Sequence, residues 1–180
     1  MNIFHMHEDP IIAAQMMCDK HVVKMIVESA QILSTAHRVL DGEEFYDLSK
    51  NGRRVKKWRL PKDQDPYFYH AHSAMHPSCI WARASADNYM WLYRHFRALC
   101  KEYTYRYGKF HATDTKMSAT LLNLPKNIPD IGLTEFNQSM PDYCKREDAV
   151  EAYRTYYLNE KKYFAKWTKR EKPDWWKECA

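Results

Sequence analysis

The stretch Asp19–Leu40, DKHVVKMIVESAQILSTAHRVL, decides the fold of this chain. It contains neither Gly nor Pro. At roughly 100° of turn per residue, its side chains separate into a wide apolar arc and a narrow polar arc. An ordinary surface helix has an apolar stripe only about 100° wide. The stretch therefore predicts a helix that is buried on most of its sides.

The narrow arc of this helix, here called the polar seam, carries charged and hydrogen-bonding side chains. Its members are Lys20, His21, Lys24, Glu28, Gln31, Thr35 and Arg38. Fully exposed helix faces are usually wider and richer in repeated Glu and Lys. We therefore interpret the seam as one wall of a cleft, and a strip of solvated surface is the alternative interpretation.

The composition indicates a mainly α protein. A chain of 180 residues is most simply one domain, 1–180, and its four glycines disfavour a Gly-rich phosphate loop. We predict a single-domain helical bundle around the buried helix 19–40, with long irregular loops. The first residues, Met1 to His7, are expected to form a short strand or an extended arm.

The compartment follows from the cysteines and from the absence of targeting signals. Five cysteines without a CxxC pair indicate reduced thiols. The N-terminus lacks the basic and apolar regions of a signal peptide, and no apolar run approaches the roughly 20 residues that span a bilayer. We expect a cytoplasmic protein with no membrane partner. Its oligomeric state is left open.

A second long helix is predicted over 79–107, between Ser78 as N-cap and Gly108. One face of it is unusually polar for a packing seam. That face carries Trp81, Ser85, Asn88, Leu92, His95, Leu99, Glu102 and Arg106. Buried polar groups need partners. We therefore expect this face and the polar seam to line one cleft, and a purely structural hydrogen-bond network is the alternative.

The remaining segments are expected to be loops, apart from a short helix near 111–122 and a third long helix over 147–170. Residues 42–78 read as irregular, and residues 123–145 read as a candidate lid. The first of these loops contains a basic run around Trp58, made of Arg53, Arg54, Lys56, Lys57 and Arg59. Cations interleaved with aromatic rings suit nucleic acid, because cations bind phosphate and rings stack on bases.

Three histidines, His70, His72 and His76, fall within seven residues of the same loop. They invite a metal site, but no Cys pair, HExxH motif or carboxylate at a ligand spacing accompanies them. A histidine-lined polar pocket is the preferred interpretation and a metal site the weaker one. No cofactor is predicted.

Several segments together resemble a largely uncharacterised family of small tailed-phage proteins. They are MNIF at the start, Asp9-Pro10, DKHVVKM at 19–25, ESAQILSTAHR at 28–38, HPSCIW at 76–81, NYMWLYRHF at 88–96, EYTYRYGK at 102–109 and FAKWTKR at 164–170. The resemblance implies a phage protein in the host cytoplasm with a role in DNA base modification or base excision. It assigns no catalytic residue.

The chain is also similar in size and in basic, aromatic, helical character to the small phage pyrimidine-dimer glycosylases. Those enzymes use the N-terminal amine of a short residue as nucleophile. Here Met1 is followed by Asn2, which departs from that pattern. The sequence alone therefore does not predict an amine nucleophile.

The leading hypothesis is an enzyme that acts on a DNA base, by group transfer to a modified pyrimidine or by cleavage of the glycosidic bond. Glu28 is the candidate base, His21 and His95 are candidate proton carriers, and Lys24 a candidate nucleophile. The candidate substrate-binding residues are Lys20, Gln31, Thr35, Arg38, Asn88, Tyr89, Trp91, Glu102, Arg106, His76, Arg53, Arg54, Lys56 and Lys57. Tyr89, Trp91 or Phe136 would stack on a base, in single-stranded DNA or flipped out of a duplex.

Two hypotheses from other classes remain. A non-catalytic nucleic-acid-binding protein would bind with strong salt dependence and tolerate Glu28→Gln. An enzyme acting on a small nucleotide or phosphorylated metabolite would use Lys20, Lys24 and Arg38 as a phosphate clamp and would not bind DNA. Glu28 discriminates between them, because a carboxylate weakens a phosphate site and makes most sense as chemistry.

Overall fold

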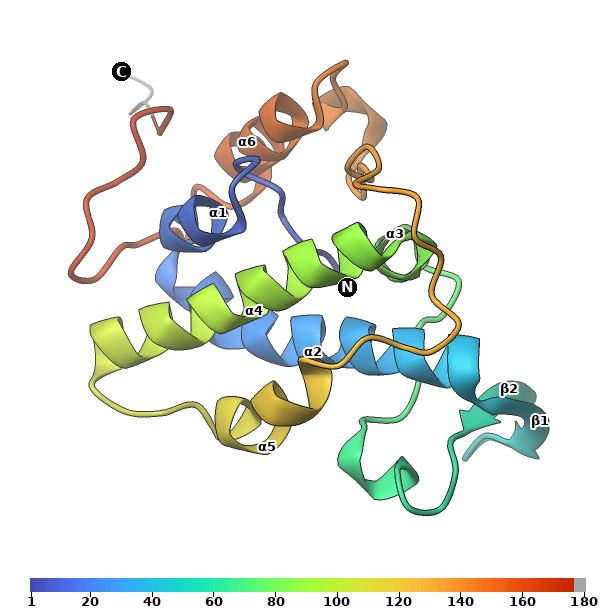
Figure 1. Ribbon diagram of the computed structural model, residues 1–180. Coiled ribbons are helices and arrows are strands. Elements are labelled where there is room, and N and C mark those ends of the chain that lie inside the picture. Colours follow the sequence, from blue (N-terminus) through green and yellow to red (C-terminus); the bar gives the residue numbers. More distant parts are fainter. Residues whose placement is uncertain (177–180) are drawn as a thin grey trace.

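The computed structural model describes residues 1–176 and is mainly helical, which confirms the prediction of a mainly α protein. Its elements in chain order are α1 (Pro10–Met16), α2 (Asp19–Asp41), β1 (Glu43–Leu48), β2 (Arg54–Arg59), α3 (Pro77–Ala84), α4 (Ala86–Tyr107), α5 (Ala112–Leu121) and α6 (Ala149–Glu160). Single 3₁₀ turns lie at Asp65–Tyr67 and Asp142–Cys144. Figure 1 shows α2 and α4 side by side, with the hairpin of β1 and β2 at one end of α2.

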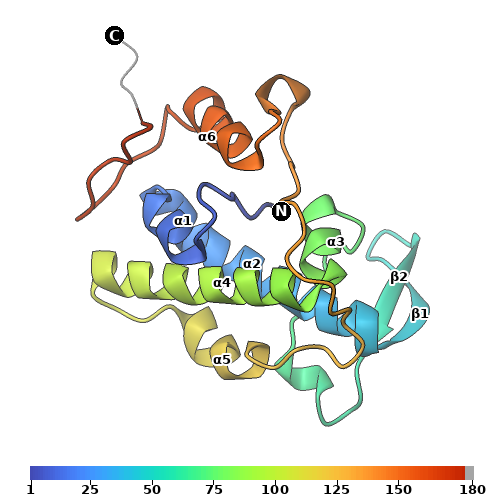
Figure 2. The same cartoon turned by 45° about the horizontal axis from the view of Figure 1, so that its top comes forward.

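Helix α2 buries most of its apolar side chains against α3, α4 and α5. Val22, Ile26 and Leu33 are fully buried. The helix ends at Gly42, where a side chain would be impossible, because an added Cβ would lie 2.4 Å from the Arg38 carbonyl oxygen. Figures 1 and 2 agree that α1 and α5 lie on opposite sides of the α2–α4 pair.

The predicted helix 79–107 is two helices, which corrects the sequence interpretation. Ser85 adopts an extended conformation, with φ −153° and ψ 151°, and separates α3 from α4. Its hydroxyl accepts a hydrogen bond from the Asp87 amide, so Ser85 acts as the N-cap of α4. The pattern alone hid this break, because the apolar period continues across it.

Residues 42–78 are not wholly irregular, because β1 and β2 form an antiparallel hairpin inside them. Glu43 pairs with Arg59 and Leu48 pairs with Arg54. The dipeptide Asn51-Gly52 lies in the connection, and Gly52 has φ +72°. Asn-Gly between two runs is a strong hairpin signal, and the sequence reading missed it.

The predicted third helix over 147–170 is shorter than expected, since α6 ends at Glu160. The following segment, 161–176, is irregular and lies against the core. The Trp167 indole N–H donates to the Met16 carbonyl oxygen at 2.9 Å, and Trp176 is buried. Side-chain anchors of this kind replace the helical hydrogen bonds that the segment lacks.

The first six residues, all of them described, form an irregular buried arm rather than a strand. The Asn2 side-chain oxygen accepts from the amides of Ile3 and Phe4, at 2.8 and 3.4 Å. Phe4 has φ +61°, a left-handed conformation that a non-glycine residue rarely adopts. The arm then continues into α1, whose N-cap is Asp9. This tight turn holds Met1 in place beside α2.

Two sequence expectations concern the whole chain. Cys18, Cys79, Cys100 and Cys144 are buried free thiols, and Cys179 lies outside the described residues. Within residues 1–176 there is no helix of the length and apolar character needed to cross a membrane.

Candidate active site

A charged corner forms where the N-terminal arm meets α2. We call it the amine corner and define it by Met1, Lys24, Glu28 and His76. The α-amino nitrogen of Met1 lies 3.9 Å from Glu28 Oε2, and the Lys24 ammonium nitrogen lies 3.1 Å from Glu28 Oε1. The Asn2 amide donates to Glu28 Oε2 at 3.0 Å. One carboxylate therefore holds both the start of the arm and a cation from the preceding turn of α2.

The corner has its reactive atoms on an accessible side. The Met1 side chain is only 4% exposed, although the residue as a whole is half-buried, so the exposed surface of Met1 is its backbone end. The Met1 sulfur packs against Cys79 Sγ at 3.8 Å and His72 Nδ1 at 3.4 Å. The side chain thus anchors the residue, while the amine remains reachable by a substrate.

His76 lies close enough to the other members of the corner to interact electrostatically with them. Burial lowers its pKa below the usual value, the Met1 ammonium lowers it further, and the Glu28 carboxylate partly opposes both effects. Its Nδ1 accepts a hydrogen bond from the Ser78 amide at 3.2 Å, because His76 is the N-cap of α3. At neutral pH, therefore, His76 is an uncharged imidazole beside an ion pair.

An amine beside a carboxylate can carry out covalent chemistry at an electrophilic carbon. An α-amino group is a weaker base than the lysine side-chain amine, so a larger fraction of it is neutral and nucleophilic near pH 7. A carboxylate within a few ångströms can take up and return protons and can stabilise positive charge on the attacked carbon. The Cys79 thiol is unsuited to this role, because burial raises its pKa to about 11.

Two further residues of the polar seam, His21 and Thr35, are held by contacts within the protein. His21 is buried, its Nδ1 shares a hydrogen bond with the Tyr157 hydroxyl, and burial lowers its pKa to about 3. It cannot carry protons near neutral pH in this state. Thr35 Oγ1 accepts from the His72 amide at 3.1 Å and thereby fixes the loop that leads to His76.

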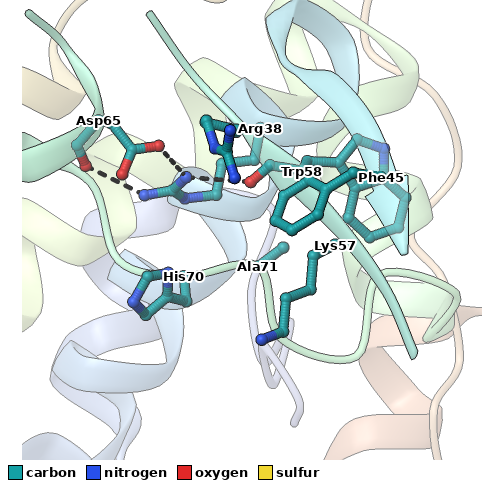
Figure 3. A pocket seen from close by; sticks show the side chains of 8 residues that line it. Arg38, Phe45, Lys57, Trp58, Asp65, His70 and Ala71 are labelled. Carbon is teal, nitrogen blue, oxygen red and sulfur yellow. Dashed lines mark hydrogen bonds and ion pairs between the residues drawn. The ribbon is translucent and has the colours of Figure 1, made fainter. Parts of the chain in front are cut away.

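Arg38 is 1% exposed and spends all five of its N–H donors inside the protein. Figure 3 shows its guanidinium directed at Asp65 and at the backbone oxygen of Trp58, in a hollow of about 400 Å³ that Lys57 and His70 also line. The expected role of Arg38 in substrate binding is therefore corrected, because it ties the hairpin to α2.

The polar face of α4 does not join Glu28. Asn88 is fully buried, donates to the Trp81 carbonyl at 2.8 Å and to Thr134 Oγ1 at 2.7 Å, and accepts from the Thr134 amide. His95 Nδ1 donates to the Pro10 carbonyl at 2.9 Å, and burial lowers its pKa to about 4. Helices α2 and α4 pack directly on each other, so these residues serve packing and not a shared cleft.

Glu102 and Arg106 form a buried ion-pair network at the other end of α4. Arg106 bonds to Glu102 at 3.1 Å and to Asp19 at 3.0 Å, and it also donates to two backbone carbonyls of α1 and its C-terminal end. Glu102 also accepts from Arg170. This network joins α4 to α2 and to the C-terminal segment, which corrects the expected substrate-binding role of both residues.

The expected base-stacking aromatics of α4 are likewise unavailable. Tyr89 is fully buried, and its hydroxyl donates to the Leu121 carbonyl at 2.9 Å. Trp91 is 5% exposed, and its indole N–H donates to the Glu8 carbonyl at 2.6 Å. Neither ring can stack on a nucleobase in this conformation.

The basic run lies on β2 and the turn before it, and its cations are exposed. Lys56 pairs with Glu44 at 2.9 Å, and Lys57 pairs with Asp47 at 2.6 Å. The Arg54 guanidinium lies 3.8 Å from the Tyr46 ring centroid. These strand-to-strand contacts leave the cations on the surface, as phosphate binding requires.

Two more residues of the polar seam, Lys20 and Gln31, belong neither to the amine corner nor to the basic run. Lys20 is exposed, with its ammonium 5.0 Å from the Phe164 ring centroid, and Gln31 is half-buried. His70, His72 and His76 do not converge. Among residues 1–176, no group of three His, Cys, Asp or Glu side chains has the placement to hold a metal ion.

One candidate group that the sequence did not predict is the α-amine of Met1, which lies 3.9 Å from Glu28 Oε2. The dipeptide Met1-Asn2 counted against it, because a short residue is expected at that place. The available signal was the buried pattern Ile3, Phe4 and Met6, which predicts a terminus packed into the core. A terminus packed beside α2 places its amine at a fixed position.

Comparison with known proteins gives one match. A family model described as pyrimidine dimer DNA glycosylase matches residues 1–116, from the N-terminal arm into α5. The match includes the whole amine corner and the hairpin. No curated protein and no solved structure matches this chain.

Proposed function

The chain belongs to the pyrimidine dimer DNA glycosylase family, and on that premise we propose that it excises dimerised pyrimidines from DNA with the α-amine of Met1 as nucleophile. The observation that carries the proposal is the 3.9 Å separation of this amine from Glu28 Oε2, at a site open to solvent. The family match favours the excision alternative and gives no support to group transfer. Glu28 keeps the role of acid–base residue, and Lys24 balances its charge.

The proposed chemistry begins with the neutral amine. Its lone pair attacks C1′ of the deoxyribose, and the glycosidic bond breaks with its electron pair leaving on the pyrimidine. The amine's two protons pass to the departing base and to O4′ of the opened sugar, which leaves an imine between Met1 and C1′. Glu28 relays these protons and stabilises the positive charge that develops at C1′. Water then hydrolyses the imine.

DNA binding is assigned to the exposed cations near the corner. Phosphate contacts position a protein on the duplex without reading its sequence, and each one makes affinity more salt-dependent. Arg53 and Arg54 on the hairpin are the most available, because neither forms an ion pair with a carboxylate within residues 1–176. Lys56 and Lys57 add positive charge to the same surface.

Borohydride trapping tests the nucleophile directly. The protein is mixed with a duplex that carries one thymine dimer, and sodium borohydride reduces any imine to a stable cross-link. We expect a cross-link that disappears when Gly-Ser is added before Met1, since this moves the amine away from Glu28. Lys24→Arg is the matched control, because arginine keeps the ion pair with Glu28 but forms no imine under these conditions.

Peptide mapping of the cross-link separates the alternatives. Attachment at Met1 supports the proposal. Attachment at Asn2 would mean that Met1 is removed in the cell; the Asn2 nitrogen lies 3.0 Å from Glu28, so the chemistry would be unchanged. Attachment at a lysine side chain, or DNA binding with no cleavage, would contradict the amine mechanism. The latter result would favour a non-catalytic binding protein.

A further inference from the structure

An apolar side chain stands fully in solvent next to the amine corner. Met75 is 77% exposed, immediately precedes His76 in the chain, and sits in the loop between the hairpin and α3. Exposed apolar side chains are common on protein surfaces when they are scattered. Met75 differs from a scattered residue in two respects, because its backbone is held rigidly and because it borders the proposed site.

The turn that presents Met75 is braced from several sides. The His76 amide donates to the Ser73 carbonyl at 2.8 Å, which makes Ala74 and Met75 the two central residues of a β-turn. The Arg83 guanidinium holds the Ala74 carbonyl at 2.7 Å. Ser73 has φ +49°, a strained conformation for a residue other than glycine. A flexible loop would release this strain, so the contacts fix the direction of the turn.

The same loop is tied to the nucleophile. The His72 Nδ1 atom contacts the Met1 sulfur at 3.4 Å, and the Cys79 thiol donates to the His72 carbonyl at 3.6 Å. Met75 therefore keeps a constant position relative to the α-amine. A hollow of about 640 Å³, whose walls include Lys56, Trp58, Met75 and His76, lies beside it.

An enzyme that attacks a nucleotide inside a duplex must first open the stack around it. Apolar wedges, methionine among them, perform this task in many DNA-bending proteins by entering between base steps. We propose that Met75 is such a wedge, which enters the stack beside the dimer while the hollow leaves room for the displaced nucleotide. The proposal rests on the proposed function, since it takes damaged duplex DNA as the partner.

The test compares two substrates of the same sequence, one with a thymine dimer and one with a preformed abasic site. Met75→Ala should lower kcat/KM on the dimer about tenfold, which is about 1.4 kcal/mol. It should leave the rate of imine formation at the abasic site, measured by borohydride trapping, within about twofold, because no base has to leave the stack there. Met75→Leu should restore most of the loss. Phe110→Ala is the matched control, since Phe110 is also 77% exposed but lies in the α4–α5 connection.

A second measurement is independent of catalysis. A 2-aminopurine next to the dimer becomes brighter when it loses its stacking, and this rise should appear with the wild type and with Glu28→Gln but not with Met75→Ala. Equal loss of activity on both substrates, or an unchanged fluorescence rise in Met75→Ala, would overturn the wedge. A wild type that unstacks the probe but forms no trappable imine with either duplex would support the wedge and refute the glycosylase proposal.

Discussion

The amine corner and the polar face of α4 are built from the same kinds of residue but do different things. In the corner, Glu28 meets an accessible amine and a Lys24 side chain that is 68% exposed. On α4, Glu102 is 5% exposed and meets two arginines that are satisfied by the protein alone. The polarity of a helix face therefore predicts a functional site poorly. Polar groups that stay accessible to a substrate, and are not satisfied within the protein, predict it better. Substitutions can test this contrast.

The largest effect is expected from Glu28→Gln. The amide keeps an acceptor for the Asn2 backbone but can neither relay protons nor stabilise positive charge. We expect excision of thymine dimers to fall by about 10²- to 10⁴-fold, as is usual for the loss of a general acid–base group. Single-turnover cleavage of labelled DNA measures this. The melting temperature serves as control, and an active Glu28→Gln protein would refute the catalytic role of the corner.

The next largest effect is expected on stability, from Glu102→Ala. This change leaves Arg106 and Arg170 without their shared carboxylate, and breaking a buried pair costs about 3 kcal/mol or more. Urea unfolding should detect the loss. Glu102→Gln, which keeps an acceptor oxygen, is the milder comparison. Activity per folded molecule should be unchanged, and a selective loss of activity would return Glu102 to the site.

A smaller difference between the two regions is expected in how the free energy of unfolding depends on pH. His95 is buried with a pKa lowered to about 4, so below its unfolded pKa of about 6.5 the unfolded chain binds a proton that the folded chain refuses. Stability is therefore complete above pH 6.5 and falls as the pH drops toward 4. The contribution of His95 is at most about 1.4 kcal/mol per pH unit.

Histidine variants show which residue causes the loss of stability between pH 6.5 and 4. His95→Gln should flatten the dependence of unfolding free energy on pH between 6.5 and 4, while its amide can still donate to the Pro10 carbonyl. His76→Gln should flatten it less, because His76 is less buried and Glu28 favours its charged form. Urea titrations at three pH values measure both slopes. A steeper contribution from His76 than from His95 would reverse the assignment.

The sequence predicted the part of this molecule that depends on local periodicity. The helix from Asp19 to Asp41 follows from an uninterrupted apolar arc, and Glu28 and Lys24 follow from its polar seam. The break at Ser85 could not be read from the period alone, because a helix interior tolerates a serine and the apolar period continues across it. The hairpin was readable from Asn51-Gly52 but was masked by the basic run around it.

Pairing across the chain was beyond reach of the sequence. Asn88, His95 and Glu102 had the composition of a site, but their partners come from a loop, α1 and the C-terminal segment. The α-amine was set aside for another reason, because Met1-Asn2 lacks the short first residue that the resemblance implies. Its position depends on the tight turn at Phe4 and on the packing of Met1, both of which are tertiary features.

The smallest effect is expected from Lys24→Ala, which tests whether Lys24 contributes to the reaction or only to the charge of the amine corner. The Lys24–Glu28 pair is an exposed i,i+4 ion pair, so its loss should cost only about 0.3–0.5 kcal/mol of stability. Its removal leaves Glu28 in contact with the Met1 amine and the Asn2 amide. We therefore expect kcat/KM for dimer excision to fall only about twofold in Lys24→Ala, and Lys20→Ala, which removes a cation from the same helix without touching Glu28, is the matched control. Single-turnover rates measure both variants. A loss of about tenfold or more in Lys24→Ala alone would make Lys24 part of the reaction, and an equal loss in both variants would assign the effect to the general loss of positive charge near DNA.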